Sequence, residues 1–455
     1  MKTIFITLAS GQEITNFLTG DFYRLAKAYK DVRLVFFLPG DQIKKYKSQF
    51  AHERCLIESI PPVDLEWKPK KIFRIACFGC IPTRTIWSRN LFSYYNGGSL
   101  FGLVGKQILW CLGHLKAWRH LMRLAEYHIF REDRLWKAYF DTYKPEVGFG
   151  TGMIAEEDIT MVKYAKRHGI PTVGMMRGWD NFTSKGFLRV HPDILLVQNQ
   201  SMIKEARDLN SFPKNRIRVV GFPRWDHYLD HEWHMSKEEF AAKFNLDPHK
   251  RWIVYFGGGL LLGLFNLPET GDHVSMLNRA IQRGEIANAC TIIRPHPSYT
   301  QYLSREARKS PVLAFGKGWD FVFDELKLLL NLVRLSDVTL NLGSTMALEA
   351  AIFDKPSILI SFTGFVNDAQ LPWHRRPSVA LDDTVHYQIV EKTGGVWRVY
   401  NERELVQAVK TYLEKPELHR DGRKRIVEEL VGPLDGKAGQ RAFEIVIDQL
   451  KKIEN

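Results

Sequence analysis

The sequence predicts an α/β protein of two doubly wound, parallel-sheet domains, and three observations support this prediction. First, 455 residues are more than one hydrophobic core usually holds. Second, short apolar runs alternate with helical segments, which is typical of a parallel sheet covered by helices. Third, the alternation begins again after a charged stretch near 222–245. We expect an N-terminal domain over 1–225, a C-terminal domain over 226–435 and a last helix over 436–455 that packs back on the first domain.

The elements follow from the apolar runs and their periodicity in chain order. In the first domain, buried strands are expected at 4–9, 33–39, 146–151, 170–176, 193–199 and 217–223, with helices near 21–30, 156–168 and 201–209. In the second domain, we expect strands at 251–259 and 289–297, a strand–turn–helix–strand unit over 336–362, and helices at 403–414 and 437–453.

One segment, 84–137, interrupts the alternation because it is long, aromatic and basic. Its spacing around 114–125 is helical. The two adjacent faces of this helix are apolar (Leu115, Trp118, Met122) and basic (Lys116, Arg119, Arg123). Two interpretations stay open. The helix packs on the sheet with a solvated basic side, or the segment contacts a membrane surface or docks an acceptor.

The charge of the chain limits its partners. The chain contains 64 Lys and Arg residues and 51 Asp and Glu residues, so its net charge is +13, which favours polyanionic partners. The basic residues are dispersed and no nucleic-acid motif is present, so nucleic acid is not expected. No uncharged stretch reaches the ~20 residues of a membrane span, and the opening apolar run is too short for a signal peptide. We expect a cytoplasmic protein, free or at the inner face of the cell membrane.

Several expected strands of the second domain end in residues suited to a ligand. In an open α/β sheet, ligands bind at the carboxyl ends of the strands. FGGG brings Gly257 and Gly258, whose backbone a ligand can approach closely. RPHPS brings Arg294 and His296 directly after an apolar run. A structural strand exit with a hydrogen-bonded His is the alternative for RPHPS.

The stretch LGSTMALEAA supplies a third strand end. Gly343, Ser344 and Thr345 form a tight turn that opens a helix, where backbone amides and two hydroxyls can bind a phosphate. Glu349 lies about one turn further on, so its carboxylate can meet the hydroxyls of a ribose. Together these residues predict a nucleotide clamp. Alternatively, Ser344 only caps the helix and Glu349 faces water.

Two loops of the first domain are expected at its own strand ends. RGWDNFTSKG places Arg177, Asp180, Asn181, Ser184 and Lys185 after the strand PTVGMM. This loop either lines a cleft that faces the second domain or is a hydrogen-bonded loop.

The other candidates of the first domain lie near its first and third predicted strands and at the domain boundary. Ser10 and Gly11, after the first strand, are a further wall of the same cleft. Glu156 and Glu157 begin a helix, where the helix dipole favours acidic residues in any case. Asp226, in GFPRWD, is as readily structural as functional.

The combination of RGWDNFTSKG, GFPRWD, RPHP and GSTMALEAAIFDKP resembles bacterial surface-polysaccharide transferases of the GT-B glycosyltransferase type, over about 146–362. The last motif is also similar to the nucleotide-binding turn of UDP-N-acetylglucosamine 2-epimerases and of CDP-glycerol glycerophosphotransferases. The resemblance implies two Rossmann-like domains that face a cleft, and a nucleotide-activated donor. It implies that the donor-binding residues are Gly257, Gly258, Arg294, His296, Gly343, Ser344, Thr345 and Glu349.

The activity that this resemblance implies is transfer of a sugar from a nucleotide sugar to a hydroxyl of a glycan or lipid-linked glycan. Helix amides and cationic side chains stabilise the leaving phosphate, with no metal or other cofactor. An inverting enzyme needs a general base, for which we choose Asp180 ahead of Glu157, Glu156 and Glu13. RPHP and the Gly-Ser-Thr turn differ from the epimerase motifs, which argues against epimerisation. A CDP-linked polyol phosphotransferase and a non-catalytic nucleotide-sugar-binding protein are the alternatives.

Overall fold

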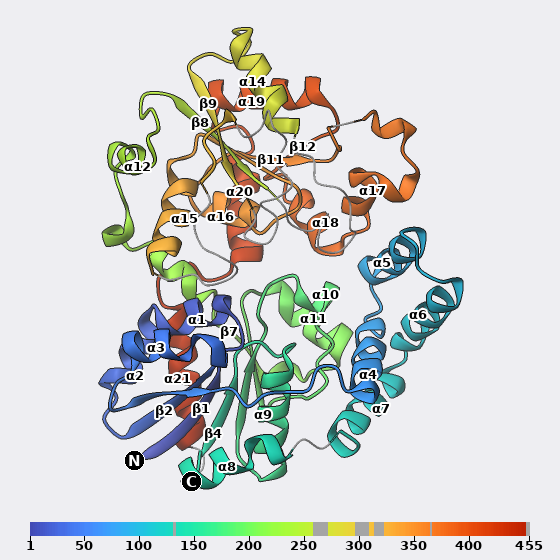
Figure 1. Cartoon of the computed structure of the whole chain (residues 1–455), viewed down its shortest axis with the longest axis vertical. Helices are drawn as coiled ribbons and strands as arrows, with labels where there is room; N and C mark the ends of the chain where they lie inside the picture. The colour runs from blue at the N-terminus through green and yellow to red at the C-terminus, as the bar shows by residue number, and fades with distance from the viewer. Residues whose placement is uncertain (131–132, 258–271, 296–308, 314–322, 365, 452–455) are drawn as a thin grey trace. The chain divides into compact units, whose positions relative to one another are not determined.

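The computed structural model describes residues 1–130, 133–257, 272–295, 309–313, 323–364 and 366–451. Its contacts divide the chain into two compact units. Unit 1 comprises Met1–Ile86, Val104–Leu229 and Gly432–Asn455, and unit 2 comprises Trp87–Leu103 and Asp230–Val431. Each unit is built around one parallel sheet (Figure 1).

Unit 1 holds a seven-stranded sheet in the order β3-β2-β1-β4-β5-β6-β7, and all neighbours pair in parallel. The chain order reverses between β1 and β4, which makes this the topological switch point of the sheet. The strands are β1 Lys2–Thr7, β2 Val32–Leu38, β3 Cys55–Ser59, β4 Val147–Gly150, β5 Thr172–Met175, β6 Ile194–Val197 and β7 Ile217–Val219.

The helices of unit 1 include one from the far end of the chain. They are α1 Gly11–Leu18, α2 Asp21–Ala28, α3 Ile43–Phe50, α4 Lys68–Gly79, α7 Lys116–His128, α8 Asp133–Tyr143, α9 Glu156–Arg167, α10 Asn181–Ser184, α11 Ser201–Asn210 and α21 Ala438–Lys451. In Figure 1 the red α21 lies among the blue and teal elements of this unit. Its Phe443 packs edge-on against Phe22 in the core, with ring centroids 5.6 Å apart.

Unit 2 holds a five-stranded parallel sheet in the order β12-β11-β10-β8-β9, with its switch point between β8 and β10. The strands are β8 Arg251–Phe256, β9 Ala289–Arg294, β10 Val338–Asn341, β11 Ser357–Ile360 and β12 Trp397–Val399. The helices are α12 Lys237–Phe244, α14 Asp272–Gln282, α15 Phe323–Leu335, α16 Met346–Ile352, α17 Pro377–Asp382, α18 Val385–Lys392, α19 Glu402–Glu414 and α20 Arg420–Ile426. The division between the units falls within α5 Arg84–Tyr95 and α6 Leu100–Gly113.

The two doubly wound parallel sheets confirm the predicted fold class. Every strand that the sequence predicts is present, but some end earlier than expected. The strand predicted to reach residue 223 ends at Val219, because Gly221 takes a positive φ of 91° and Pro223 begins a 3₁₀ turn. The edge strands β3 and β12 were not predicted. No helix within the described residues is long and apolar enough to cross a bilayer.

The basic side of α7 is not the solvated face that the first sequence-based interpretation expected. Arg119 is buried and donates a hydrogen bond from Nη1 to the Gly113 carbonyl at 2.7 Å. Arg123 donates from Nε to the Leu188 carbonyl at 2.8 Å. These two guanidinium groups therefore hold the helix to unit 1, whereas Lys116 is exposed.

Candidate functional site

In unit 2, three predicted ligand residues share one edge of the sheet. Gly257 follows β8, Arg294 ends β9, and Gly343 lies just after β10. The Gly257 N–H donates to the Arg294 carbonyl at 3.0 Å. This edge includes the switch point between β8 and β10, where doubly wound sheets bind ligands. Gly258 and His296 lie outside the described residues.

Asn341, the last residue of β10, organises the turn that follows. Its Oδ1 accepts hydrogen bonds from the N–H groups of Gly343 at 3.1 Å and Ser344 at 3.2 Å. The Tyr387 hydroxyl donates to the Ser344 carbonyl at 2.5 Å. Two of the amides expected to bind phosphate are thus occupied by Asn341, and Thr345 is the N-cap of α16. Sequence reasoning missed Asn341, although an Asn before a glycine turn is a signal for such a bond.

Glu349 and Arg294 are buried charged groups near this edge. Glu349 is 2% exposed, so the alternative in which it faces water is wrong. Arg294 is 5% exposed and donates from Nη1 to the Pro295 carbonyl at 2.5 Å. Burial lowers the pKa of Arg294 to about 10, and Glu325 acts in the opposite direction. Buried charges of this kind are costly unless they are paired or bind a ligand.

In unit 1, a second polar cluster lies at the switch point between β1 and β4. Ser10 and Gly11 follow β1 and begin α1. The Ser10 N–H donates to Glu13 Oε2 at 2.9 Å, and Arg177 Nε donates to Glu13 Oε1 at 2.7 Å. Arg177 comes shortly after β5. This partly buried ion pair therefore joins the loops after two different strands.

Gly152, which follows β4, lies directly against the Glu13–Arg177 pair. A Cβ atom at this position would stand 1.8 Å from Glu13 Oε1 and 3.3 Å from Arg177 Nε. A side chain here would push the Glu13 carboxylate out of its present place beside Arg177, so the glycine leaves room for this ion pair.

Two further carboxyl groups of α9 belong to the cluster. Asp158 is buried and its Oδ1 accepts from the Thr151 N–H at 3.0 Å, while its Oδ2 has no hydrogen-bond partner among the described residues. Burial and the charge of Glu13 raise the pKa of Asp158 well above its ordinary value. Burial and Glu13 also raise the pKa of Glu157, against the effect of Arg177. Three carboxyl groups around one guanidinium suit general acid–base chemistry.

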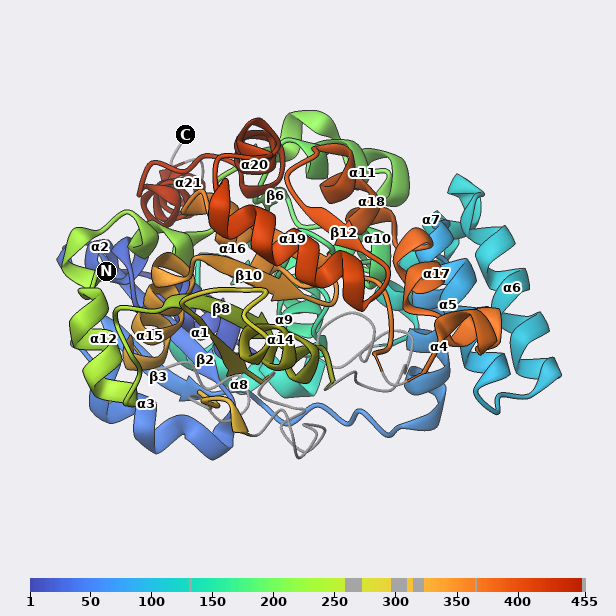
Figure 2. The same ribbon diagram turned by 90° about the horizontal axis from the view of Figure 1, so that it is seen from above.

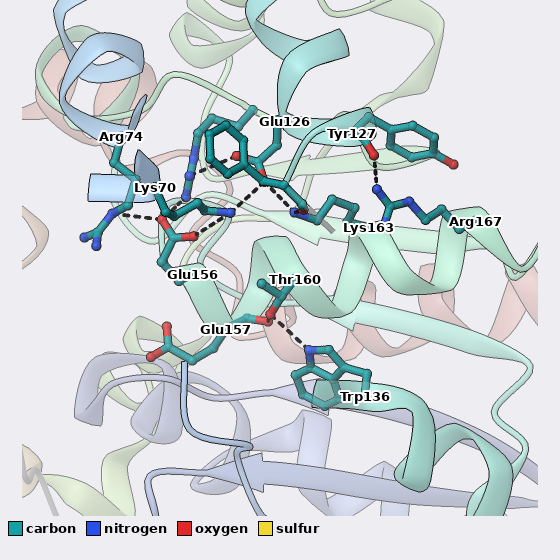
Figure 3. Close-up of polar contacts among 12 residues, drawn as sticks. Lys70, Arg74, Glu126, Tyr127, Trp136, Glu156, Glu157, Thr160, Lys163 and Arg167 are labelled. Atoms are coloured by element: carbon teal, nitrogen blue, oxygen red, sulfur yellow. Dashed lines mark hydrogen bonds and ion pairs between the residues drawn. The ribbon is translucent and has the colours of Figure 1, made fainter. Parts of the chain in front are cut away.

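Glu156 points the other way, into a buried ion network (Figure 3). The network consists of Lys70, Arg74, Glu126, Glu156, Lys163 and Arg189. Glu156 accepts from Arg189 and, at 3.0 Å, from Arg74 Nε. It therefore holds α9 against α4 and is not available as a base. In Figure 3 the Glu157 carboxylate points away from this network.

The loop RGWDNFTSKG is bonded largely to itself. Asp180 Oδ1 accepts from Asn181 Nδ2 at 3.1 Å, and Ser184 Oγ donates to the Asp180 carbonyl at 2.8 Å. Lys185 Nζ lies 3.9 Å from Asp180 Oδ2. Near Asp180 lies Glu205 of α11, which no sequence motif indicated. Burial and, to a smaller extent, the charge of Asp180 raise the pKa of Glu205 to about 8.

Solved structures share this fold at low sequence identity. The structure of S. aureus MnaA with UDP superposes with a TM-score of 0.55 and 11% sequence identity, and the alignment covers 100% of this chain and 98% of the MnaA chain. The UDP-GlcNAc 2-epimerase of Neisseria meningitidis bound to UDP-GlcNAc covers 98% and 100%, with a TM-score of 0.53 and 10% identity. The wall teichoic acid polymerase TagF covers 100% and 90%, with a TM-score of 0.54 and 10% identity.

A comparison with protein-family models gives no match, and a comparison with curated proteins gives none. At 10–11% identity, likeness to solved structures shows the fold alone. The chain has a GT-B-like fold, and the predicted relationship in fold to UDP-GlcNAc 2-epimerases and to a teichoic acid polymerase is confirmed.

Proposed function

We propose that this protein is a glycosyltransferase that moves a sugar from a nucleotide-activated donor to a hydroxyl of a glycan or lipid-linked glycan, in surface-polysaccharide synthesis at the inner face of the membrane. The observation that carries the proposal is the placement of buried charged groups at the switch-point edge of each sheet. Nucleotide and nucleotide sugar in the MnaA and N. meningitidis structures support a donor of this class.

Donor binding is assigned to unit 2. Arg294 and His296 neutralise the diphosphate, and Ser344 and Thr345 offer it their hydroxyls. Glu349 accepts hydrogen bonds from the ribose. Gly257 lets the donor approach its backbone closely. The proposal needs no metal or other cofactor.

Activation of the acceptor is assigned to unit 1. The acceptor oxygen forms a bond to the anomeric carbon, the bond from that carbon to the diphosphate breaks, and the nucleoside diphosphate leaves. The hydroxyl proton passes to a carboxylate. We favour Glu157 over Asp180 for this role, because Glu157 lies in the switch-point cluster and has a raised pKa. Asp180 is bonded within its own loop.

Two other activities are supported by the structural neighbours. Some are UDP-GlcNAc 2-epimerases, which favours isomerisation of the nucleotide sugar itself as a second candidate. TagF favours transfer of a polyol phosphate as a third. The products separate them. Sugar transfer releases a nucleoside diphosphate, phosphate transfer from a CDP-linked donor releases CMP, and isomerisation releases neither.

The first experiment measures binding of UDP, GDP, CMP, CDP and dTDP by calorimetry, with wild type, Glu349→Gln and Glu239→Gln. Glu239 is the matched control, because it caps α12 and is exposed. We expect one nucleotide to bind wild type and the control alike, and Glu349→Gln to bind it about tenfold more weakly, the equivalent of one charge-assisted hydrogen bond.

Two results would contradict the assignment. If no nucleotide binds, or if Glu349→Gln binds as tightly as the control, the clamp is wrong. If the bound nucleotide sugar is turned over without release of nucleoside diphosphate in the presence of glycan acceptors, glycosyl transfer is wrong while donor binding stands.

A further inference from the structure

Helix α6 exposes an apolar stripe that the other described residues leave uncovered. The sequence LFGLVGKQILWCLG contains Lys106 as its one charged residue. Phe101 is 91% exposed, Val104 50% and Ile108 55%. Their spacing of three and four residues places them on one face of the helix. Exposed apolar side chains on this scale mark interaction sites.

The other face of α6 fixes the helix in place. Leu109 packs closely on Gly79 of α4, where a Cβ atom would lie 3.2 Å from the Leu109 Cβ. Trp110 Nε1 donates to the Thr83 carbonyl at 2.8 Å. Both views show α6 at the outer side of the group that it forms with α4 and α7 (Figures 1 and 2). The exposed stripe is therefore the outward face of a packed helix.

The neighbouring helices also expose apolar side chains. On α4, Ile72 is 67% exposed. On and around α7, the exposed large apolar side chains are those of Leu115, Leu121, Leu124 and Ile129.

The charged residues of this segment are almost all basic. From Trp67 to Ala125 the sequence contains no Asp or Glu. It contains Lys68, Lys70, Lys71, Arg74, Arg84, Arg89, Lys106, Lys116, Arg119 and Arg123. Some of these form hydrogen bonds or ion pairs within the chain, as Lys71 does with Glu66 at 2.6 Å, and Lys68, Arg84 and Lys116 are exposed as well. An apolar face flanked by exposed cations is typical of helices that lie in the interface of an anionic bilayer.

We infer that the α6 stripe of Phe101, Val104 and Ile108 inserts into the surface of an anionic phospholipid bilayer, with the neighbouring Lys and Arg residues on the headgroups. A second copy of the chain is the less suitable occupant, because it would bring the same positive surface against itself. The inference deepens the membrane location in the proposed function, and it moves the contact from the basic side of α7 to α6.

The test uses the full chain and sedimentation with vesicles of phosphatidylcholine alone or mixed with phosphatidylglycerol. We compare wild type, the double variant Phe101→Glu/Ile108→Glu, and Val366→Glu. Val366 is the matched control because it is 52% exposed in unit 2, outside the α4–α7 region. We expect wild type and control to bind the phosphatidylglycerol vesicles, with weaker binding at high salt, and the double variant to lose about tenfold or more in affinity.

Circular dichroism and light scattering without vesicles complete the test. A double variant that keeps the wild-type spectrum and melting temperature shows that lost binding does not reflect unfolding. Equal vesicle binding by the double variant would overturn the inference. So would a wild-type dimer that the double variant breaks, without vesicle binding by either, because the stripe would then join two copies. Neither readout needs sugar transfer, so failure of the proposed activity would leave the vesicle result unaffected.

Discussion

Among single residues, Glu157 has the environment that a general base needs. It lies in the first turn of α9, near the Glu13–Arg177 pair, and burial and the charge of Glu13 raise its pKa above the ordinary value of a glutamate, the direction that favours a general base. Asp180, which the motif alone favoured, is held by Asn181 and Lys185 instead. The two carboxylates can be separated by conservative variants.

We predict that Glu157→Gln lowers the rate of sugar transfer by about 10²–10⁴, and Asp180→Asn by less than about tenfold. Binding of the donor nucleotide should be unchanged in both. Because the base acts when ionised, wild-type activity should rise with pH through the raised pKa of Glu157, above the ordinary value of the group. Rates with a measured acceptor across a pH series check this. If Asp180→Asn lowered the rate more than Glu157→Gln, Asp180 would be the general base.

The sequence allowed some of these residues to be placed and not others. Arg294, Gly257 and Gly343 could be placed at strand ends, because apolar runs show where buried strands stop. The Glu13–Arg177 pair joins residues 164 positions apart, and no local pattern encodes such a contact. The function of the predicted residues stays a prediction until the binding and rate measurements are made.

At the scale of elements, the buried ion network decides how α4, α7 and α9 are held together. Glu126 of α7 accepts from Lys70 of α4 at 2.9 Å and from Lys163 of α9 at 2.5 Å. Arg189 Nη1 lies 3.0 Å from its other oxygen. Burial alone would raise the pKa of Glu126, but these three cations lower it to about 2.

We predict that Glu126→Gln destabilises the protein at neutral pH by about 3–5 kcal/mol, because it leaves buried cations without their partner. Because the pKa of Glu126 is lowered, its carboxylate stabilises the protein fully at pH values above 4.5, the ordinary pKa of Glu. This stabilisation is lost as the pH falls toward about 2. The difference in the free energy of unfolding between wild type and Glu126→Gln should therefore become smaller as the pH falls over this range. Denaturant unfolding at several pH values measures it, with Glu66→Gln, an exposed partner of Lys71, as the control. A difference independent of pH would contradict this account.

The elements also show where periodicity fails. The strands inside the sheets are continuous apolar runs and were predicted in order. The edge strands β3 and β12 are only partly buried, so their sequences lack a continuous apolar run. The helices α4 to α8 pack through scattered aromatic and charged side chains, and their number did not follow from the one amphipathic pattern near 114–125.

At the scale of the whole molecule, α21 completes the core of a unit that β1 begins. The Asp226 carboxylate accepts from the N–H groups of Ala438 at 3.0 Å and Gly439 at 2.8 Å, at the start of that helix. We predict that Asp226→Ala destabilises unit 1 by about 1–2 kcal/mol, as loss of a helix cap does.

Scanning calorimetry checks this prediction against Asn401→Ala, which removes the cap of α19 in unit 2. The Asp226 variant should lower the transition of unit 1, and the Asn401 variant that of unit 2, each by about 2–4 °C. Equal shifts of a single transition in both variants would mean that the two units unfold as one.

The place of α21 in the chain also sets an order of events during protein synthesis. Every segment of unit 2 leaves the ribosome before α21 does. Unit 2 can therefore form its core while the chain is still being synthesised. Unit 1, although its first strand is made earlier, completes its core only when α21 is made, and until then the apolar residues that α21 covers stay exposed. The half of the protein that is translated first is the half that finishes folding last, and it depends longest on protection from aggregation.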